Sequence, residues 1–328
     1  MIRILRSAER KMVEIQPAPC GGGLPDDTLW IDLLSPAREE VQYVEKALGL
    51  ELPTHEEMLE IEPSSRLYQD AGATFATASL LWNAETDAPE MSPTTFVLGE
   101  RVLVTIRYGQ PKSFTMFQAQ AEKQVAVCHS SATVLVGLLE AIIDRLADIL
   151  ERCTSEVDKI SKDVFGRASP SGKIHTASQE YTNTLKRIGR QQDLVNKARE
   201  SLVGLGRVVG FLTVSRQPPL DKAGREHLKT LARDARSLTD HAAFIISNIN
   251  FLLDATLGMI NIEQNTIIKI FSVAAVAFLP PTLVASIYGM NFDLMPELKW
   301  PYGYPLAICL MILSAVVPFL YFRRRKWL

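Results

Sequence analysis

Residues 270–291, with the sequence IFSVAAVAFLPPTLVASIYGMN, carry no charged side chain. At about 1.5 Å of rise per residue, a helix of this length crosses the roughly 30 Å hydrocarbon core of a bilayer. A second uncharged run, YGYPLAICLMILSAVVPFLYF, covers residues 302–322 after a short polar loop. The two runs predict a helical hairpin in a membrane. The alternative, a buried core hairpin of a soluble protein, is disfavoured because two such runs with a basic end are hard to bury.

Basic side chains next to the two runs predict the orientation of the hairpin. Residues 323–326, RRRK, follow the second run, and Lys269 precedes the first. The connecting loop contains Lys299 but also the acidic Asp293 and Glu297. Because basic residues that flank spans stay in the cytoplasm, both termini are predicted to be cytoplasmic and the loop external.

Composition excludes several classes of function. The formal net charge of the 328 residues is −2, which gives no reason to expect a nucleic-acid partner. The four cysteines are scattered without a CxxC pair, which fits a reducing cytosol and argues against a zinc site or a disulfide framework. No glycine-rich phosphate loop opens a helix, and no nucleophile–base pattern is visible. We therefore expect neither a nucleotide cofactor nor an enzyme, and the first residues show no apolar segment typical of a signal peptide.

The first 125 or so residues are typical of a mixed α/β domain. Short apolar runs with turn signals between them predict strands, and apolar residues at three- and four-residue spacing predict a helix. The predicted elements are strands at 29–33 and 74–82, a helix at 38–50, and a hairpin of 94–98 with 101–108 around Gly99-Glu100.

From Ala132 onward, the spacing of apolar residues predicts three long helices. Breaks at residues 169–172, SPSG, and 217–219, QPP, separate them. The third helix would be roughly 100 Å long, which is too long to lie on a small domain, so we expect a stalk that enters the membrane as the first span. The predicted organisation is a cytoplasmic α/β plus helical-hairpin domain (1–219), a stalk helix (220–269), a first span (270–291), an external loop (292–301), a second span (302–322) and a basic cytoplasmic tail (323–328).

Polar side chains in and next to the first span predict partner copies of the chain. A single hairpin has too few helices to enclose a water-filled path, whereas polar groups at membrane depth are tolerated where they face protein or water. Copies arranged around an axis meet both needs, and closed rings are the usual outcome of head-to-tail contacts. The alternative is that these side chains bond back to their own helix. The polar residues are Asn265, Ser272, Thr282, Ser286 and Asn291, interleaved with the small Ala275.

Residues 260–305 resemble the CorA family of divalent-cation transporters, and in particular the magnesium, cobalt and nickel transporters of Gram-negative bacteria. The tripeptide Gly289-Met290-Asn291 closes the first apolar run, and MPEL at 295–298 and the basic tail follow it. The similarity is close over the last eighty or so residues and looser elsewhere, where EMLEIEPSSR at 57–66 also looks family-like.

The resemblance implies a homopentamer in the bacterial inner membrane, in contact with lipid, with a cytoplasmic funnel and the first spans around a pore. It further implies passive uptake of Mg²⁺, with Co²⁺ and Ni²⁺, gated by intracellular Mg²⁺. A zinc transporter of the same fold, with possible proton coupling, is the second hypothesis; that subfamily usually lacks the MPEL sequence found here. A membrane-anchored scaffold that conducts nothing is the third.

The resemblance also assigns candidate site residues. Five copies of Asn291 would form a neutral amide ring that holds a hydrated ion, and Gly289 would let the backbone turn so that Asn291 faces the axis; an ordinary helix C-cap is the alternative. Asp293 and Glu297 would make the entrance negative, unless they are ordinary loop residues. The pore-lining candidates, which otherwise would face neighbouring helices, are Asn265, Ile268, Phe271, Ser272, Ala275, Leu279 and Thr282.

Carboxylates in the cytoplasmic part are the candidates for sensing Mg²⁺. Asp254 on the stalk corresponds to a family position for one ligand, and Glu60, or failing that Glu57, lies near the other. Clustered carboxylates would repel one another without a cation, and bound Mg²⁺ would bridge them and favour the closed state. A solvated acidic face is the alternative.

Overall fold

The computed structural model divides the chain into two compact units, Met1–Leu253 and Asp254–Leu328. Both contain part of one helix, α7 (Lys222–Tyr288). The units are described separately below. The structure describes residues 1–8, 11–15, 24–123, 129–166, 174–215, 221–290 and 300–325.

The first unit contains a seven-stranded mixed sheet with the order β2-β1-β3-β7-β6-β5-β4. Strands β3 and β7 are parallel, and every other neighbouring pair is antiparallel. The tight connection between β6 and β7 is closed by the Gly99 N–H, which donates to the Val102 carbonyl at 3.0 Å. The strands are β1 (Ile2–Ala8), β2 (Lys11–Ile15), β3 (Thr28–Leu34), β4 (Leu67–Asp70), β5 (Ala73–Trp82), β6 (Glu90–Leu98) and β7 (Leu103–Arg107).

Short helices cover one face of this sheet. Val44 of α1 (Arg38–Leu48) and Met58 of α2 (His55–Leu59) are buried in one apolar cluster with strand residues such as Phe75. Helix α1 ends at Gly49, whose φ of +66° lies in the left-handed region and whose N–H donates to the Glu45 carbonyl at 2.8 Å. A further short helix, α3 (Pro63–Arg66), precedes β4.

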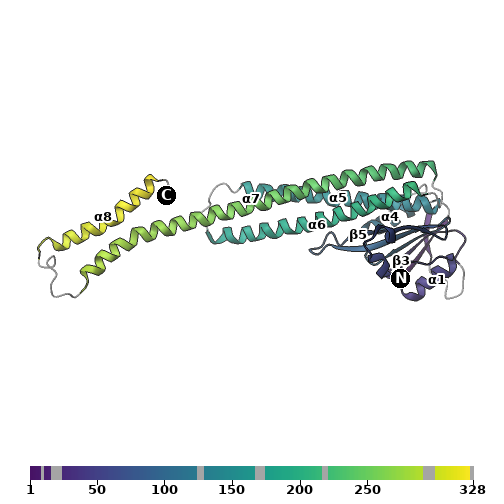
Figure 1. Ribbon diagram of the computed structural model, residues 1–328, viewed down its shortest axis with the longest axis horizontal. Coiled ribbons are helices and arrows are strands. Elements are labelled where there is room, and N and C mark those ends of the chain that lie inside the picture. Colours follow the sequence, from purple (N-terminus) through teal and green to yellow (C-terminus); the bar gives the residue numbers. More distant parts are fainter. Residues whose placement is uncertain are drawn as a thin grey trace. The chain divides into compact units, whose positions relative to one another are not determined.

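Longer helices cover the other face (Figure 1). They are α4 (Lys112–Lys123), α5 (Ser131–Gly166) and α6 (Ile174–Val214). The buried Trp30 ring of β3 packs against Phe114 and Phe117 of α4, with ring centroids 6.2 and 5.8 Å apart. The buried Ser201 hydroxyl of α6 accepts the Leu81 N–H of β5 at 2.8 Å, which ties that helix to the sheet.

The part of α7 that belongs to the first unit runs beside α5 and α6 (Figure 1). Apolar side chains are buried along it at three- and four-residue spacing, so one stripe of the helix packs and the rest is polar or exposed. The buried residues of this stripe are Leu228, Leu231, Ala235, Ala242, Ile245, Ile249 and Leu252.

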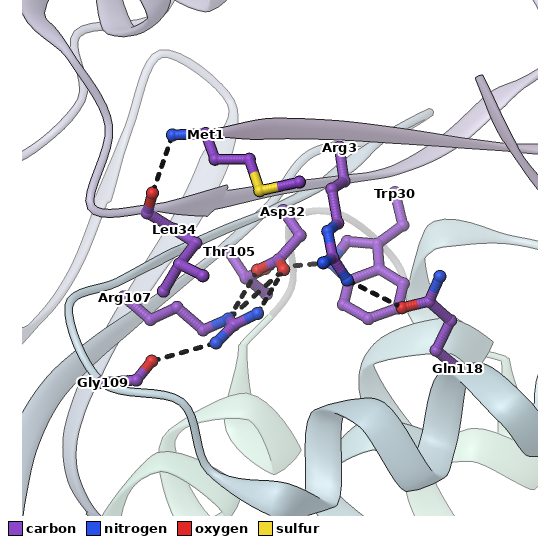
Figure 2. A network of polar contacts seen from close by, with 9 residues as sticks. All are labelled: Met1, Arg3, Trp30, Asp32, Leu34, Thr105, Arg107, Gly109 and Gln118. Carbon is purple, nitrogen blue, oxygen red and sulfur yellow. Dashed lines mark hydrogen bonds and ion pairs between the residues drawn. The ribbon is translucent and has the colours of Figure 1, made fainter. Parts of the chain in front are cut away.

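A buried ion pair joins the two parallel strands at the centre of the sheet (Figure 2). Arg107 of β7 donates to Asp32 of β3 at 2.7 Å, and the side chains are only 6% and 4% exposed. Thr105 donates to the same carboxylate at 2.8 Å and accepts from the Trp30 indole at 2.9 Å. A second Arg107 nitrogen donates to the Gly109 carbonyl at 2.9 Å. The low dielectric around this network makes each unpaired member costly.

The second unit contains the C-terminal part of α7 and the helix α8 (Gly303–Arg324). Helix α7 has 67 residues, so it is about 100 Å long. Pro280 and Pro281 lie inside α7 and Pro318 inside α8, and both helices continue past them.

The predicted fold class is confirmed: an N-terminal α/β domain is followed by a long helix that continues through the first apolar run. The strands and helices predicted in the first unit are all present. The sequence patterns did not predict β1, β2, β4, α2, α3 or α4.

Candidate functional site

Two helices of the second unit are long and apolar enough to cross a membrane. Only 6% of the most apolar window of α7, and none of that of α8, is buried within the chain. Large side chains therefore stand uncovered, for example Phe278 of α7 at 73% and Leu313 of α8 at 61% exposure. An apolar surface of this kind needs lipid or further protein to cover it.

The candidate pore-lining residues share one face of α7. At about 100° per residue, their positions fall within about 120° of one another around the helix axis. Three large apolar members are well exposed in the single chain: Phe271 at 72%, Leu279 at 66% and Ile268 at 61%. Of the others, Asn265, Ala275 and Thr282 are exposed and Ser272 is half-buried.

Thr266 and Thr282, in the C-terminal part of α7, bond through their hydroxyls to their own helix. Thr282 donates to the Phe278 carbonyl at 2.7 Å, and Thr266 donates to the Ile262 carbonyl at 2.9 Å. Each hydroxyl retains acceptor capacity, so this geometry leaves Thr282 able to accept a hydrogen bond from a water on its exposed side. Thr282 thus bonds back to its own helix, as the alternative for the polar residues expected. It still remains a candidate for lining the pore.

The end of α7 is tightened by two backbone bonds. The Gly289 N–H donates to the Ala285 carbonyl at 3.0 Å, and the Met290 N–H donates to the Ile287 carbonyl at 3.2 Å. A Cβ added at Gly289 would lie 3.2 Å from that Ala285 oxygen, which is a tight contact that the backbone would have to relieve by a small shift. Glycine therefore allows this backbone geometry without that shift. Among the described glycines, positive φ occurs only at Gly49 and Gly72.

Several predicted site residues lie outside the described residues. Asn291 at the expected pore mouth and the loop residues Asp293 and Glu297 fall within 291–299, so their assignments rest on the sequence alone. Met290, which precedes them, is 49% exposed.

The carboxylate of Glu57 is already engaged within its own helix. Its Oε2 accepts the Thr54 N–H at 2.8 Å and the Thr54 hydroxyl at 3.0 Å, while the Glu57 N–H donates to that hydroxyl at 3.3 Å. This reciprocal arrangement caps the N-terminus of α2. The sequence analysis missed the role of Thr54, although the spacing Thr54-x-x-Glu57 is the signature of a capping box.

Acidic residues gather around α2 nonetheless. Partial burial, with the charges of Glu57, Asp70 and Glu51, raises the pKa of the nearby Tyr68 hydroxyl. Glu60 follows α2 and is exposed, and Asp254 on α7 is exposed as well. Within the described part of a single chain, no three His, Cys, Asp or Glu side chains gather into a group that could hold a metal ion. Asp254 and Glu60 therefore stay predicted metal ligands of a site formed between two chains.

An α/β domain followed by two helices with uncovered apolar segments, of which the first is the long helix α7, is the architecture of a membrane protein with a large domain outside the bilayer. Residues 25–324 match the family model described as "CorA-like Mg2+ transporter protein", and the chain belongs to this family of transporters, which are not enzymes.

Relatives and solved structures agree with this assignment. The chain is 37% identical over 302 residues to the "Magnesium transport protein CorA" of Salmonella typhimurium and 36% identical over 302 residues to that of Pectobacterium atrosepticum. Each match covers 92% of both chains. The complete structure of the CorA magnesium transporter from Methanocaldococcus jannaschii superimposes with a TM-score of 0.76 at 20% identity, covering 100% of this chain and 99% of the other.

Proposed function

We propose that this chain forms a homopentameric channel that takes up Mg²⁺, together with Co²⁺ and Ni²⁺, passively across the bacterial inner membrane. The observation that carries the proposal is the similarity to proteins named for magnesium transport, which extends over nine-tenths of both chains. The uncovered candidate face of α7 supports it, because a ring of such faces would enclose a path that one chain cannot. Both termini would be cytoplasmic, as the basic residues next to the spans predict.

Asn291 is the proposed selectivity residue. Mg²⁺ is small and gives up its waters reluctantly, so a site that passes it quickly should not strip them. A ring of amide oxygens accepts hydrogen bonds from those waters without holding the ion as strongly as a carboxylate ring would. The close approach at Gly289 would fix the backbone just before this ring.

The acidic loop residues Asp293 and Glu297 would concentrate cations at the entrance. Their contribution should fade as ionic strength rises, because exposed charges are screened over a distance of about 8–10 Å in physiological salt.

Further along the path, large apolar side chains would close the channel by excluding water. Leu279 and the neighbouring pair Ile268 and Phe271 are the largest members of the candidate face, and all three are exposed in the single chain. A constriction lined by such groups dewets and blocks a hydrated ion, so widening it by a small rotation of α7 would restore conduction.

Intracellular Mg²⁺ would control the channel through carboxylates between neighbouring subunits. Asp254 of one chain and Glu60 of the next are the proposed ligands. Both are exposed, whereas Glu57 is occupied by its capping contacts and is the weaker candidate.

Flux into proteoliposomes tests the proposed function. We expect Mg²⁺ to enter down its gradient without ATP, and Asn291→Ala to abolish entry while the protein still assembles at five times the 36.5 kDa chain mass. Zn²⁺ flux that depends on a pH gradient would favour the zinc hypothesis instead. A ring that assembles and passes no ion would favour a scaffold, and a protein that remains monomeric would exclude the pore.

A further inference from the structure

Helices α5 and α7 run parallel within the first unit, in a register that changes by only one residue along the contacts described here. His227 of α7 contacts Glu140 of α5, and His241 contacts Thr154; each pair is 87 positions apart in the sequence. Further along, the rings of Phe165 and Phe251 stack with centroids 6.0 Å apart, at an offset of 86. An offset that stays within one residue means that successive turns of the two helices face each other in order. The two histidines are thus separated by the same rise on α7 as their partners are on α5.

The two histidine contacts differ in chemistry. His227 Nε2 lies 3.1 Å from Glu140 Oε1, and both side chains are partly exposed, at 42% and 45%. His241 Nε2 lies 3.4 Å from the neutral Thr154 hydroxyl. Histidine is the side chain that ordinarily changes charge between pH 5 and 8. Protonation therefore turns the first contact into an ion pair and leaves the second one without a charged partner.

Charged groups of both signs lie along the two helices near the first contact. Asp144 and Asp148 follow Glu140 on α5, and Asp234 is on α7. Partial burial, with the charges of Glu140, Asp148 and Asp234, raises the pKa of Asp144. Of the basic side chains, Arg145 pairs with Glu85 and lies 3.6 Å from Asp148, and Lys229 of α7 pairs with Glu226 at 2.8 Å. Arg225 and Arg233 lie on the same turns of α7. A positive charge on His227 would therefore be attracted by the Glu140 carboxylate, which it contacts, and opposed by the basic side chains of its own helix.

We propose that the Glu140–His227 contact is a proton-binding site that holds the first turns of α7 more tightly on α5 as the pH falls. This goes beyond the proposed ion transport and does not depend on it. A contact that is stronger in its protonated form is favoured by acid through linkage. Asp144 acts in the same direction: a carboxyl whose folded-state pKa is raised destabilises the packed state as pH rises past its ordinary value of about 4.

Local opening of α7 can be measured directly in the full-length protein. Near its start the helix is capped by Asp221, whose Oδ1 accepts the Gly224 N–H at 2.7 Å. Amide hydrogen exchange of residues 222–231 reports how often these turns detach. After correction for intrinsic exchange, we expect their protection at about pH 6 to exceed that at about pH 8 by about two- to fivefold, the range of a partly exposed ion pair.

Matched variants separate this site from other sources of pH dependence. Glu140→Gln and His227→Gln should each abolish the difference between the two pH values, whereas His241→Gln should retain it. The proposal is overturned if wild-type protection does not change with pH, or if Glu140→Gln responds like the wild type. Loss of the response in Asp144→Asn, with retention in Glu140→Gln, would also overturn it.

Mg²⁺ flux measured at the same two pH values keeps this proposal distinct from the proposed function. The exchange response should be present at constant Mg²⁺ whether or not the reconstituted protein passes ions. A preparation without flux but with the Glu140-dependent response would refute transport and leave the proton site standing. A preparation with Mg²⁺ flux but without the exchange response would refute the proton site and leave transport standing.

Discussion

Asp32 and Arg107 form a charge pair at the centre of the sheet, where both side chains are almost entirely buried. The Asp32 carboxylate accepts from two Arg107 nitrogens and from Thr105, and the Arg107 guanidinium also lies 4.6 Å from the Phe114 ring centroid. Such a pair is a weak source of net stability when intact, but removal of one partner leaves an uncompensated buried charge.

Asp32→Ala should therefore destabilise the first unit by about 3–5 kcal/mol, because Arg107 would remain buried without its counter-ion. Thermal unfolding followed by circular dichroism would show the loss as a lower midpoint. Asp26→Ala is the matched control, since its pair with Arg101 is largely exposed, at 100% and 68%, and its loss should change little. Equal midpoints for the two variants would contradict the role given to the buried pair.

Gly289→Ala should reduce Mg²⁺ uptake more than it reduces assembly. The added Cβ would press on the Ala285 carbonyl at 3.2 Å, and the backbone must shift at the point that leads to Asn291. Initial flux rate per assembled ring is the measurement. Gly210→Ala on α6 is the control, because a Cβ there meets nothing within 4 Å. Undiminished flux in Gly289→Ala would show that close approach at this turn is dispensable.

At the scale of the element, the candidate face of α7 would line the ion path, and its other faces would contact lipid or neighbouring helices. Leu279 belongs to the candidate face, whereas Ile270, which is 50% exposed, lies nine residues earlier and therefore about half a turn around the helix. Replacing a large apolar side chain by alanine should therefore have different effects on ion flux at the two positions.

Leu279→Ala should raise Mg²⁺ leak under conditions in which the wild-type channel is closed, because a smaller side chain widens and wets the constriction. Ile270→Ala, the control, should leave the leak at the wild-type level. Flux into liposomes at high internal Mg²⁺ distinguishes them. If both variants leak equally, the assignment of this face to the path is wrong.

At the scale of the whole molecule, the proposed ring links carboxylates on different chains. The double variant Asp254→Ala, Glu60→Ala should conduct even at high internal Mg²⁺, since no bridging cation would favour the closed state. The measurement is the internal Mg²⁺ concentration that halves the flux, compared with that of Glu57→Gln, whose carboxylate is engaged with Thr54 and whose replacement should preserve inhibition. Inhibition that is unchanged in the double variant would identify the acidic face as merely solvated.

Patterns local in the sequence predicted most of the elements of the first unit. Strand β3 was visible as an apolar run, and the β6–β7 hairpin as two strands around Gly99-Glu100. Helix α4 was not predicted, although its buried Phe114, Phe117 and Ala121 have helical spacing, because the segment is short and its polar residues dominate. For the site, the resemblance to the CorA family suggested the candidate face of α7, whose large apolar members are exposed in the single chain. The sequence patterns did not show that Glu57 is engaged with Thr54.

By itself the sequence determined the two apolar helices and the candidate motif at the end of the first. Bilayer thickness and the cost of charge in hydrocarbon act on uninterrupted local composition, which a sequence displays directly. Only the tertiary structure decided that Asp32 is buried against Arg107, 75 residues away, and that His227 faces Glu140, 87 residues away. Such contacts depend on which distant segments pair and in what register, and the spacing of residues along one segment carries no information about that.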